Sequence, residues 1–458
     1  MKKIQSLFYL AALALLLFSS SCEDDPIIGV KTFDVIVQLE YPAPFEPAGG
    51  VTVRLRNLTT GVVDENVADS AGAAVFTVVA GVYEATVSEE RADDYFRYII
   101  TGSRINIAVT DTWFSDIPVP LPLTATSLPK PAEGDVSPYG KLIIKELYVG
   151  GCQKDDGSGA WTRDAYLIVY NNSSQPAAID NLAIGTCFPH NAHQATSAFW
   201  VNGAWIYANE SWLPSVYGAW QTTKRDTLAP GEQRVIVVYQ AIDHTSVYSN
   251  SVNLANAAYY VAYDPESGYS NTSYHIPPSE LIPTAQYLKA YRLPGVTANA
   301  WTISVNSPAL FLFTPRDGTS LADFANDENN KVLHGTSASQ AALKVPRTWI
   351  LDAIEVFQED RIADSKTRFT PDVNVGYVPY TNNFGHTLYR NVDKAATEAI
   401  FGNAGKLVYN YSLGMEESTD PSGIDAEASI RNGAFIIYRE TNNSTNDFHQ
   451  RSRASLRD

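Results

Sequence analysis

An insertion rich in aromatic residues separates Cys187 from Leu228 and is the longest departure from strand-like patterning in this sequence. It contains half of the tryptophans of the chain. Trp and Tyr rings offer flat faces for stacking on sugars, porphyrins or another protein, and long ordered loops commonly carry binding surfaces. The predicted ligand-binding residues are Trp200, Trp205, Tyr207, Trp212, Tyr217 and Trp220. The alternative is that these rings form a satellite hydrophobic core beneath the loop.

Two histidines at the start of this insertion, His190 and His193, are candidates for metal or heme binding. Their spacing would place both on one face of a helix, but Pro189 and Asn191 favour a loop. No third ligand lies close in the sequence if Cys187 is oxidised. We therefore expect a solvated loop here, and we assign no metal or other cofactor.

Catalytic motifs are not found in the sequence, which contains no nucleophile elbow, no metalloprotease helix and no Walker loop. The acidic segment 155–159 lacks the alternating oxygen ligands of a calcium loop, so we expect a turn. A pair of catalytic carboxylates could be brought together only by the tertiary fold. The sequence therefore does not predict an enzyme, and a hydrolase stays an alternative.

The N-terminal residues have the three parts of a secretory signal. Two lysines at positions 2 and 3 and an apolar run from Leu7 to Phe18 precede three serines and Cys22. The apolar run is too short for a good membrane span. The serines before Cys22 resemble a bacterial lipobox, in which cleavage leaves the cysteine as an acylated N-terminus. The predicted parts are a signal peptide at 1–21, lipidation of Cys22 and an acidic tether at 22–30; the alternative is an ordinary cleaved signal with an incidental cysteine.

Cys152 and Cys187 are the two cysteines that remain once Cys22 is assigned to the lipid. An even pair of cysteines in an oxidising compartment is typical of a disulfide. The predicted bridge joins the loop after the strand at 142–149 to the end of the segment 182–186. Two free buried thiols are the competing possibility.

The composition favours β-structure and argues against a nucleic-acid partner. The chain has 458 residues with 26 Tyr and 8 Trp, and 18% of its residues are charged, which suits strands better than disorder. Its formal net charge is −17, whereas binding to a phosphate backbone needs clustered Lys and Arg. We therefore expect an exported all-β protein, long enough for two or three domains.

Residues 31–125 predict a first β-domain. Segments 33–39 and 50–58 alternate apolar and polar residues, and an Ala-Gly-Val-Tyr sequence opens a later strand at 80–87. This order resembles the Ig/transthyretin-like or carboxypeptidase-regulatory-like β-sandwich, whose members act mostly as spacers or interaction units. The Pro-rich stretch 126–140 is expected to be a semi-rigid linker.

Residues 141–458 predict a larger β-domain founded on two apolar strands, at 142–149 and 165–170. Further strand patterns lie at 234–239, 309–313, 349–357 and 385–390, and a short helix is expected at 395–400. The founding pair, and a Pro-Gly turn before the strand at 234–239, resemble a lamin-tail-like β-sandwich elaborated by long insertions.

Taken in order, the leader, the first sandwich and the larger domain resemble an uncharacterised family of Bacteroidota outer-membrane lipoproteins (domain of unknown function 4876). The acidic residues at 23–25 look like the surface-export signal of such lipoproteins. Members tend to be encoded beside TonB-dependent receptors. The resemblance implies a lipid-anchored, surface-exposed accessory or ligand-capturing component of a TonB-dependent uptake system, with a small ligand or glycan as partner. The alternative is a structural or adhesive surface protein that binds proteins or host glycans.

Overall fold

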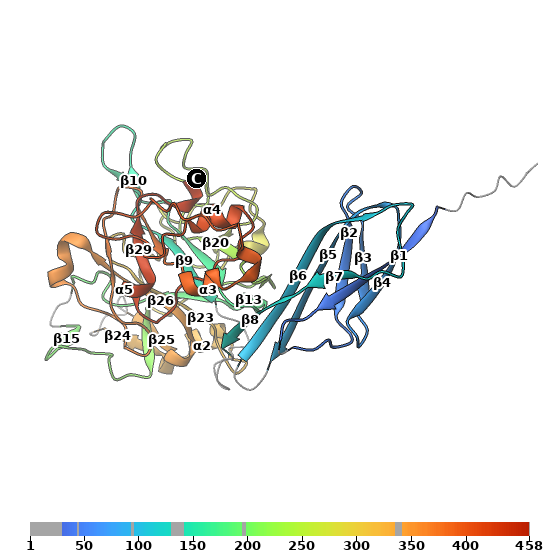
Figure 1. Ribbon diagram of the computed structural model, residues 1–458. Coiled ribbons are helices and arrows are strands. Elements are labelled where there is room, and N and C mark those ends of the chain that lie inside the picture. The colour runs from blue at the N-terminus through green and yellow to red at the C-terminus, as the bar shows by residue number, and fades with distance from the viewer. Residues whose placement is uncertain are drawn as a thin grey trace, which may run out of the picture. The chain divides into compact units, whose positions relative to one another are not determined.

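The computed structural model describes residues 30–43, 45–92, 96–129, 142–194, 198–334 and 341–457. The chain divides into two compact units, Met1–Lys130 and Pro131–Asp458, whose strands run from blue to red along the sequence in Figure 1. The predicted signal peptide, Cys22 and all but the last residue of the tether lie outside the described residues. Within the described ranges, no helix is long and apolar enough to cross a membrane.

The first unit is a sandwich of two sheets, with strand orders β4-β1-β7 and β3-β2-β5-β6-β8. Its strands are β1 (Thr32–Glu40), β2 (Thr52–Asn57), β3 (Val63–Val67), β4 (Ala73–Val79), β5 (Gly81–Ala92), β6 (Phe96–Val109), β7 (Val119–Pro122) and β8 (Thr124–Pro129). Apolar residues at alternate positions of β1 are buried, because successive side chains point to opposite faces of a strand. Val35, Val37, Val53 and Leu55 belong to the resulting core. The predicted sandwich is therefore confirmed.

The end of the first unit lies beyond the predicted boundary. Strand β8 pairs with β6, with Thr124 opposite Thr101 and Pro129 opposite Phe96. Residues 126–129 of the predicted linker are therefore part of a strand, and residues 130–140 lie outside the described residues. Proline is tolerated at Pro129 because it ends a strand at the edge of its sheet.

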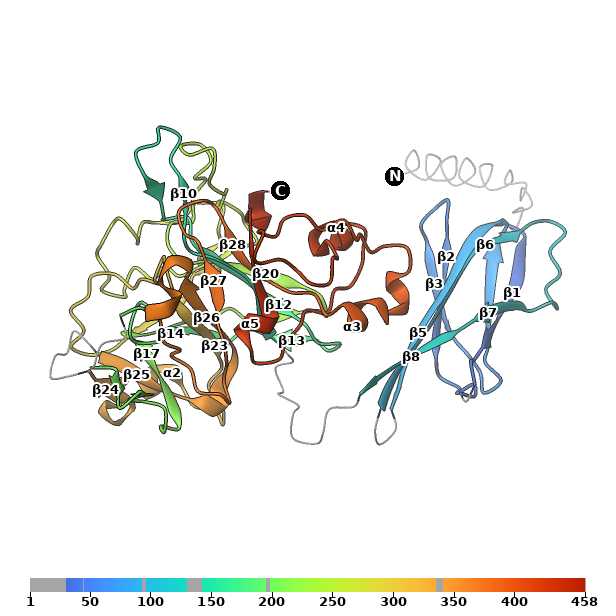
Figure 2. The same cartoon turned by 60° about the vertical axis from the view of Figure 1, so that its left-hand side comes forward.

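Two six-stranded sheets form the frame of the second unit, in the orders β21-β20-β12-β9-β28-β29 and β22-β18-β14-β23-β26-β27. The strands of the first sheet are β9 (Leu142–Tyr148), β12 (Tyr166–Asn171), β20 (Gln233–Val237), β21 (Tyr260–Val261), β28 (Thr387–Arg390) and β29 (Phe448–Arg451). Those of the second are β14 (Ala183–Thr186), β18 (Gly218–Gln221), β22 (Lys289–Arg292), β23 (Ala309–Phe313), β26 (Ile350–Gln358) and β27 (Val378–Tyr380). Figure 2 shows β26 and β27 side by side.

Smaller elements complete the second unit. A three-stranded sheet is formed by β17 (Trp212–Val216), β25 (Ala341–Pro346) and β24 (Lys331–Leu333). The two-stranded pairs are β10 (Cys152–Gln153) with β11 (Ala160–Trp161), β13 (Ala177–Ala178) with β19 (Thr227–Leu228), and β15 (Trp200–Val201) with β16 (Ala204–Trp205). The α-helices are α2 (Leu321–Asn326), α3 (Lys394–Glu398), α4 (Ala426–Arg431) and α5 (Ser444–Asp447). Helix α3 confirms the helix predicted at 395–400.

The predicted founding pair, β9 and β12, lies in the middle of the first sheet, and every residue of both strands is buried. Their inner faces join the hydrophobic core between the two large sheets, to which Leu147, Leu167 and Leu312 belong. Their outer faces are covered as well, by clusters that include Ile143 and Ile168. Burial on both faces explains the near-continuous apolar sequence of these strands.

A β-bulge interrupts the pairing of β9 with β12. Glu146 lies opposite Ile168 and Ile144 lies opposite Val169, so Lys145 is the extra residue. Before the bulge Ile144 faces the inner core, and after it Leu147 does. Side chains alternate along a strand, so the bulge turns both Lys145 and Glu146 to the outer face.

Candidate functional site

The aromatic insertion is largely core rather than surface. Trp220 lies on β18, is 1% exposed and belongs to the core between the two large sheets. Trp205 and Tyr207 are buried in a second cluster on the other face of the second sheet, with Phe311 and Phe313. A ring without an exposed face cannot stack on a ligand. The prediction that Trp205, Tyr207 and Trp220 contact a ligand is therefore corrected, and the satellite-core alternative holds for them.

Trp200, Trp212 and Tyr217 are half-buried and pack against that second cluster. Trp200 sits on the two-stranded pair formed by β15 and β16. The ammonium of Lys344 lies 5.6 Å from the centre of the Trp212 ring, which favours a cation–π contact. Ligand binding by these three residues stays a prediction.

The predicted disulfide is corrected, because Cys152 and Cys187 are both free buried thiols. Cys187 follows β14 and packs in the cluster on the second sheet. Cys152 begins β10, and its Sγ lies 3.8 Å from Oδ2 of Asp164. Asp164 lies shortly before β12 of the first sheet. Burial, followed by the charge of Asp164, raises the pKa of the Cys152 thiol to about 12. Burial also raises the pKa of Cys187 well above its ordinary value, so neither thiol is poised as a nucleophile.

The loop with His190 and His193 is held in place rather than solvated. Nη1 of the buried Arg368 donates to the carbonyl oxygens of Pro189, at 2.8 Å, and His190, at 3.1 Å. Burial and the Arg368 charge lower the pKa of His190 to about 4. In the described part of the chain, no group of three or more His, Cys, Asp and Glu side chains could hold a metal ion.

His449 on β29 is another buried imidazole. Its Nδ1 lies 2.7 Å from Oδ1 of Asn391, and its Nε2 contacts the hydroxyl of Tyr411. Burial and the positive charge of Arg451 lower the pKa of His449 from 6.5 to about 3. The imidazole is therefore neutral in the folded protein at pH 7.

We expect acid to destabilise the fold through His449. His449 binds its proton near pH 6.5 in the unfolded chain and only near pH 3 in the folded chain. Its contribution to the free energy of unfolding is therefore fully present above pH 6.5 and declines as the pH falls toward 3. Between pH 7 and pH 5 this residue should contribute a loss of about 2 kcal/mol. Urea unfolding at both pH values should show a smaller difference for His449→Gln than for the wild type. An equal pH dependence of the two proteins would contradict the assignment, and His334→Gln is the control.

A hollow lies where β26 and β27 end. These strands pair in parallel, with Gln358 opposite Tyr380, so the segments that follow them leave the sheet at the same edge. Strand β26 continues into a 3₁₀ helix, Glu359–Asp364, and β27 continues into the loop 381–386. The hollow has a volume of about 390 Å³. Its lining residues are Gln358, Glu359, Asp360, Tyr380, Thr381, Asn382, Asn383 and Phe384.

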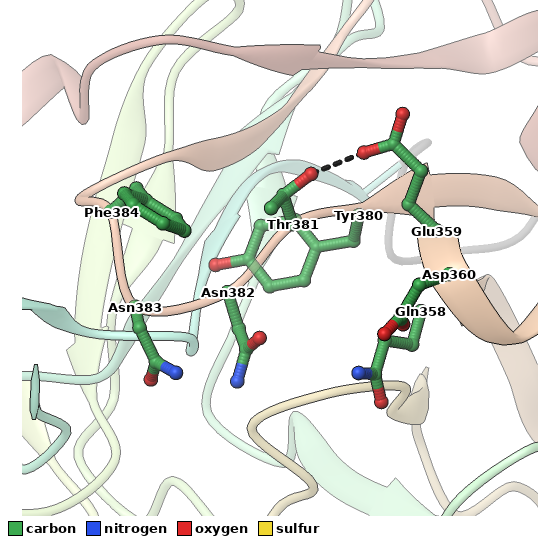
Figure 3. Close-up of a pocket in the computed structure, with 8 residues that line it drawn as sticks. All are labelled: Gln358, Glu359, Asp360, Tyr380, Thr381, Asn382, Asn383 and Phe384. Carbon is green, nitrogen blue, oxygen red and sulfur yellow. Dashed lines mark hydrogen bonds between the residues drawn. The ribbon is translucent and has the colours of Figure 1, made fainter.

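Figure 3 shows how these side chains lie. The Thr381 hydroxyl points toward the Glu359 carboxylate and donates a hydrogen bond to it. The ring of Phe384 is 57% exposed and stacks on the imidazole of His386 with 5.7 Å between ring centres. The hollow thus combines an accessible aromatic face with carboxylate and amide groups.

A second hollow adjoins the first and shares Glu359 and Thr381 with it. Its volume is about 350 Å³. The other lining residues are Pro379, Met415, Glu416, Glu417, Ser418 and Gln450. We call the two hollows together the polar groove.

The loop 381–386 is fixed by hydrogen bonds to the segment after β9. The amide of Asn383 donates to the carbonyl of Gly150 at 3.0 Å, and that of Gly385 donates to Gly151 at 2.9 Å. The hydroxyl of Tyr380 accepts from the amide of Gly150 at 3.0 Å. Asn383 and Gly385 have φ angles of 70° and 76°, a region that Asn and Gly adopt most readily. The groove therefore presents its side chains from a preorganised backbone.

The chemistry of the polar groove suits a ligand with many hydroxyl groups. Carboxylates such as Glu359 and Asp360 accept hydrogen bonds, while amides such as Gln358 and Asn382 both donate and accept. The face of Phe384 can stack on the apolar face of a sugar ring. Many polar groups around one aromatic anchor suit a ligand that is itself rich in hydroxyl groups.

We did not expect this groove from the sequence. Its lining comes from separate segments of the chain, near residues 359, 381, 416 and 450. The first two segments meet through the parallel pairing of β26 with β27. A local signal exists in Thr381-Asn382-Asn383-Phe384-Gly385, where consecutive Asn residues favour a turn and a single aromatic residue lies outside any strand pattern.

Comparisons with known proteins place the chain near one family. A family model described as a protein of unknown function (DUF4876) matches residues 229–412. This range includes β26, β27, the loop 381–386 and α3. A crystal structure of a DUF4876 family protein from Bacteroides thetaiotaomicron VPI-5482 is similar, with 20% identity over 91% of this chain and 94% of that chain and a TM-score of 0.49. No curated protein matches the sequence. The predicted resemblance to this family is confirmed, while lipidation and the transthyretin-like and lamin-tail-like assignments stay predictions.

Proposed function

We propose that this protein is a lipid-anchored, surface-exposed capture protein of the outer membrane that binds a saccharide in the polar groove for a TonB-dependent uptake system. The observation that carries the proposal is the exposed ring of Phe384, presented by a fixed loop beside hydrogen-bonding side chains. The leader sequence and Cys22 support the lipid anchor.

The charge of the groove selects among possible ligands. Four of its lining residues, Glu359, Asp360, Glu416 and Glu417, are exposed acidic side chains. They disfavour an anionic ligand such as a phosphate or a uronic acid by repulsion. A neutral saccharide satisfies the same carboxylates through its hydroxyl groups. We therefore assign neutral oligosaccharides as the ligand class.

Phe384→Ala is expected to weaken saccharide binding about tenfold without unfolding the protein. The ring is exposed, so its removal leaves no cavity, whereas the loss of stacking costs about 1 kcal/mol or more. The measurement is a screen on an array of neutral glycans followed by calorimetric titration of the best ligand. Phe114→Ala is a matched control, because Phe114 is 67% exposed and lies in the first unit.

Two results would count against the proposal. Equal affinities of wild type and Phe384→Ala would remove the groove as the binding site. Loss of binding in Trp200→Ala or Trp212→Ala instead would move the site to the half-buried rings of the aromatic insertion.

A further inference from the structure

Lys145 occupies an unusual position for a lysine. The bulge in β9 turns its side chain to the outer face of the first sheet, where it is 0% exposed. Lysine is almost never fully buried unless its ammonium has partners. The partners of its ammonium therefore explain how this charge is accommodated in the core.

Two groups contact the Nζ atom of Lys145 directly. Oε1 of Gln233, on β20, lies 2.7 Å away. Oε1 of Glu427, in α4, also lies 2.7 Å away. The amide carbon of Gln233 is bonded to the contacted oxygen by about 1.2 Å, so it lies within about 4 Å of Nζ. An amine, an amide carbon and a carboxylate thus converge at one point.

Three tyrosine rings enclose this point. The centres of the Tyr170, Tyr389 and Tyr438 rings lie 6.0, 5.6 and 5.7 Å from Nζ of Lys145. All three residues are buried. The enclosure keeps bulk water away from the ammonium of Lys145, while Gln233 is half-buried.

We propose that Lys145 and Gln233 form an intramolecular amide bond. Nζ attacks the amide carbon of Gln233, the new C–N bond forms, and the bond from that carbon to Nε2 breaks. The side-chain nitrogen of Gln233 leaves as ammonium, which carries the two protons that Nζ of Lys145 loses. The reaction exchanges one amide for another, so it needs neither an oxidant nor an external activating group.

Glu427 serves as the proton carrier of this reaction. It takes one proton from the Lys145 ammonium to give the nucleophilic amine and a second from the same nitrogen after the attack, and it passes both to the nitrogen of Gln233. Burial acts to raise the pKa of Glu427, but the Lys145 ammonium and hydrogen bonds from Lys145 and Tyr389 outweigh it and lower the pKa to about 2. The carboxylate is therefore ionised and in direct contact with the ammonium that must lose the proton. The same ion pair makes this proton transfer uphill, so it is the slow step of the reaction. Tyr389 orients it by donating a hydrogen bond of 2.7 Å to the same oxygen.

The bond would connect strands that are not adjacent. In the first sheet β12 lies between β9 and β20. A link from Lys145 to Gln233 crosses over Tyr170, which is the residue opposite Gln233 on β12. Two strands, β9 and β20, would thereby be joined covalently across β12, which limits unfolding and proteolysis of a surface protein.

Peptide mapping by mass spectrometry of the purified full chain tests the proposal. The expected result is a linked pair of peptides, one with Lys145 and one with Gln233, whose mass is their sum less one ammonia. Intact mass alone is not decisive, because succinimide formation at Asn202-Gly203 or Asn432-Gly433 also releases ammonia. Recovery of only separate, unmodified Lys145 and Gln233 peptides from the folded wild type would overturn the proposal.

Variants and a second Lys–Gln contact test whether bond formation requires Glu427 or only a short distance between lysine and glutamine. Lys145→Met and Gln233→Leu should abolish the linked peptide, and Glu427→Gln should lower its yield at least tenfold. Nζ of Lys224 also contacts a glutamine oxygen, Oε1 of Gln286, at 3.2 Å, but no carboxylate pairs with Lys224 among the described residues. This second pair should stay unlinked. A linked peptide of Lys224 with Gln286, or an undiminished yield in folded Glu427→Gln, would overturn the role of Glu427.

Discussion

Arg390→Met is expected to lower the free energy of unfolding by about 3–5 kcal/mol, because it leaves buried carboxylates without their cation. The guanidinium is 0% exposed and pairs with Asp352, with Glu440 at 2.6 Å and with Asp447 at 4.0 Å. Its Nε also donates to the carbonyl of Ile144 at 2.7 Å. Arg390 lies on β28 and Asp352 on β26, so this residue joins the two large sheets. Urea unfolding of wild type and variant measures the loss.

Arg347→Met is the matched control for that experiment. Arg347 pairs with Asp372 at a similar distance, 2.7 Å, but both side chains are partly exposed. Exposed ion pairs contribute about 1 kcal/mol or less, since water stabilises the separated charges almost as well. Equal losses in the two variants would show that burial is not what makes the Arg390 network important.

Trp220→Ala is expected to cost about 3–5 kcal/mol of stability, the usual effect of removing a buried tryptophan from a packed core. Its ring packs against those of Tyr269, His275 and Trp301, with centres 6.0 to 6.3 Å away. Trp212→Ala should cost much less, about 1 kcal/mol, because that ring is half-buried. Thermal unfolding and saccharide titration of both variants separate packing from binding.

The comparison of the two tryptophan variants decides the role of the aromatic insertion. A binding surface made of both rings would lose affinity in both variants while stability changed little. A stability loss confined to Trp220→Ala would confirm that Trp220 fills space between the two large sheets. An unchanged stability of Trp220→Ala would contradict its place in the core.

Sequence patterning identified the central strands because burial on both faces leaves long apolar runs. Strands at 142–149, 165–170 and 309–313 have this property, and the structure contains them as β9, β12 and β23. The helix near 395–400 was predictable from local sequence as well. For these elements the pattern of residues close together in the sequence is enough to predict the secondary structure.

Features that depend on distant partners were not predictable. Glu355 and Arg368 are both 0% exposed and form an ion pair, yet each is an ordinary charged residue in the sequence. The tryptophans of the insertion gave no sign of which face they turn inward, since tryptophan suits both cores and binding surfaces. The two cysteines were paired by composition, whereas in the fold both are free buried thiols. The groove needed the parallel register of β26 and β27.

In the loop 381–386 that follows β27, different groups determine the path of the backbone and the surface that the loop presents. Its path is determined by backbone hydrogen bonds to Gly150 and Gly151 and by the left-handed residue Asn383. The exposed side chain at position 384 has no part in those bonds. Substitution of this one residue would therefore change the surface of the groove while the backbone keeps its course. In this loop the backbone conformation and the identity of the exposed side chain can therefore change independently of each other.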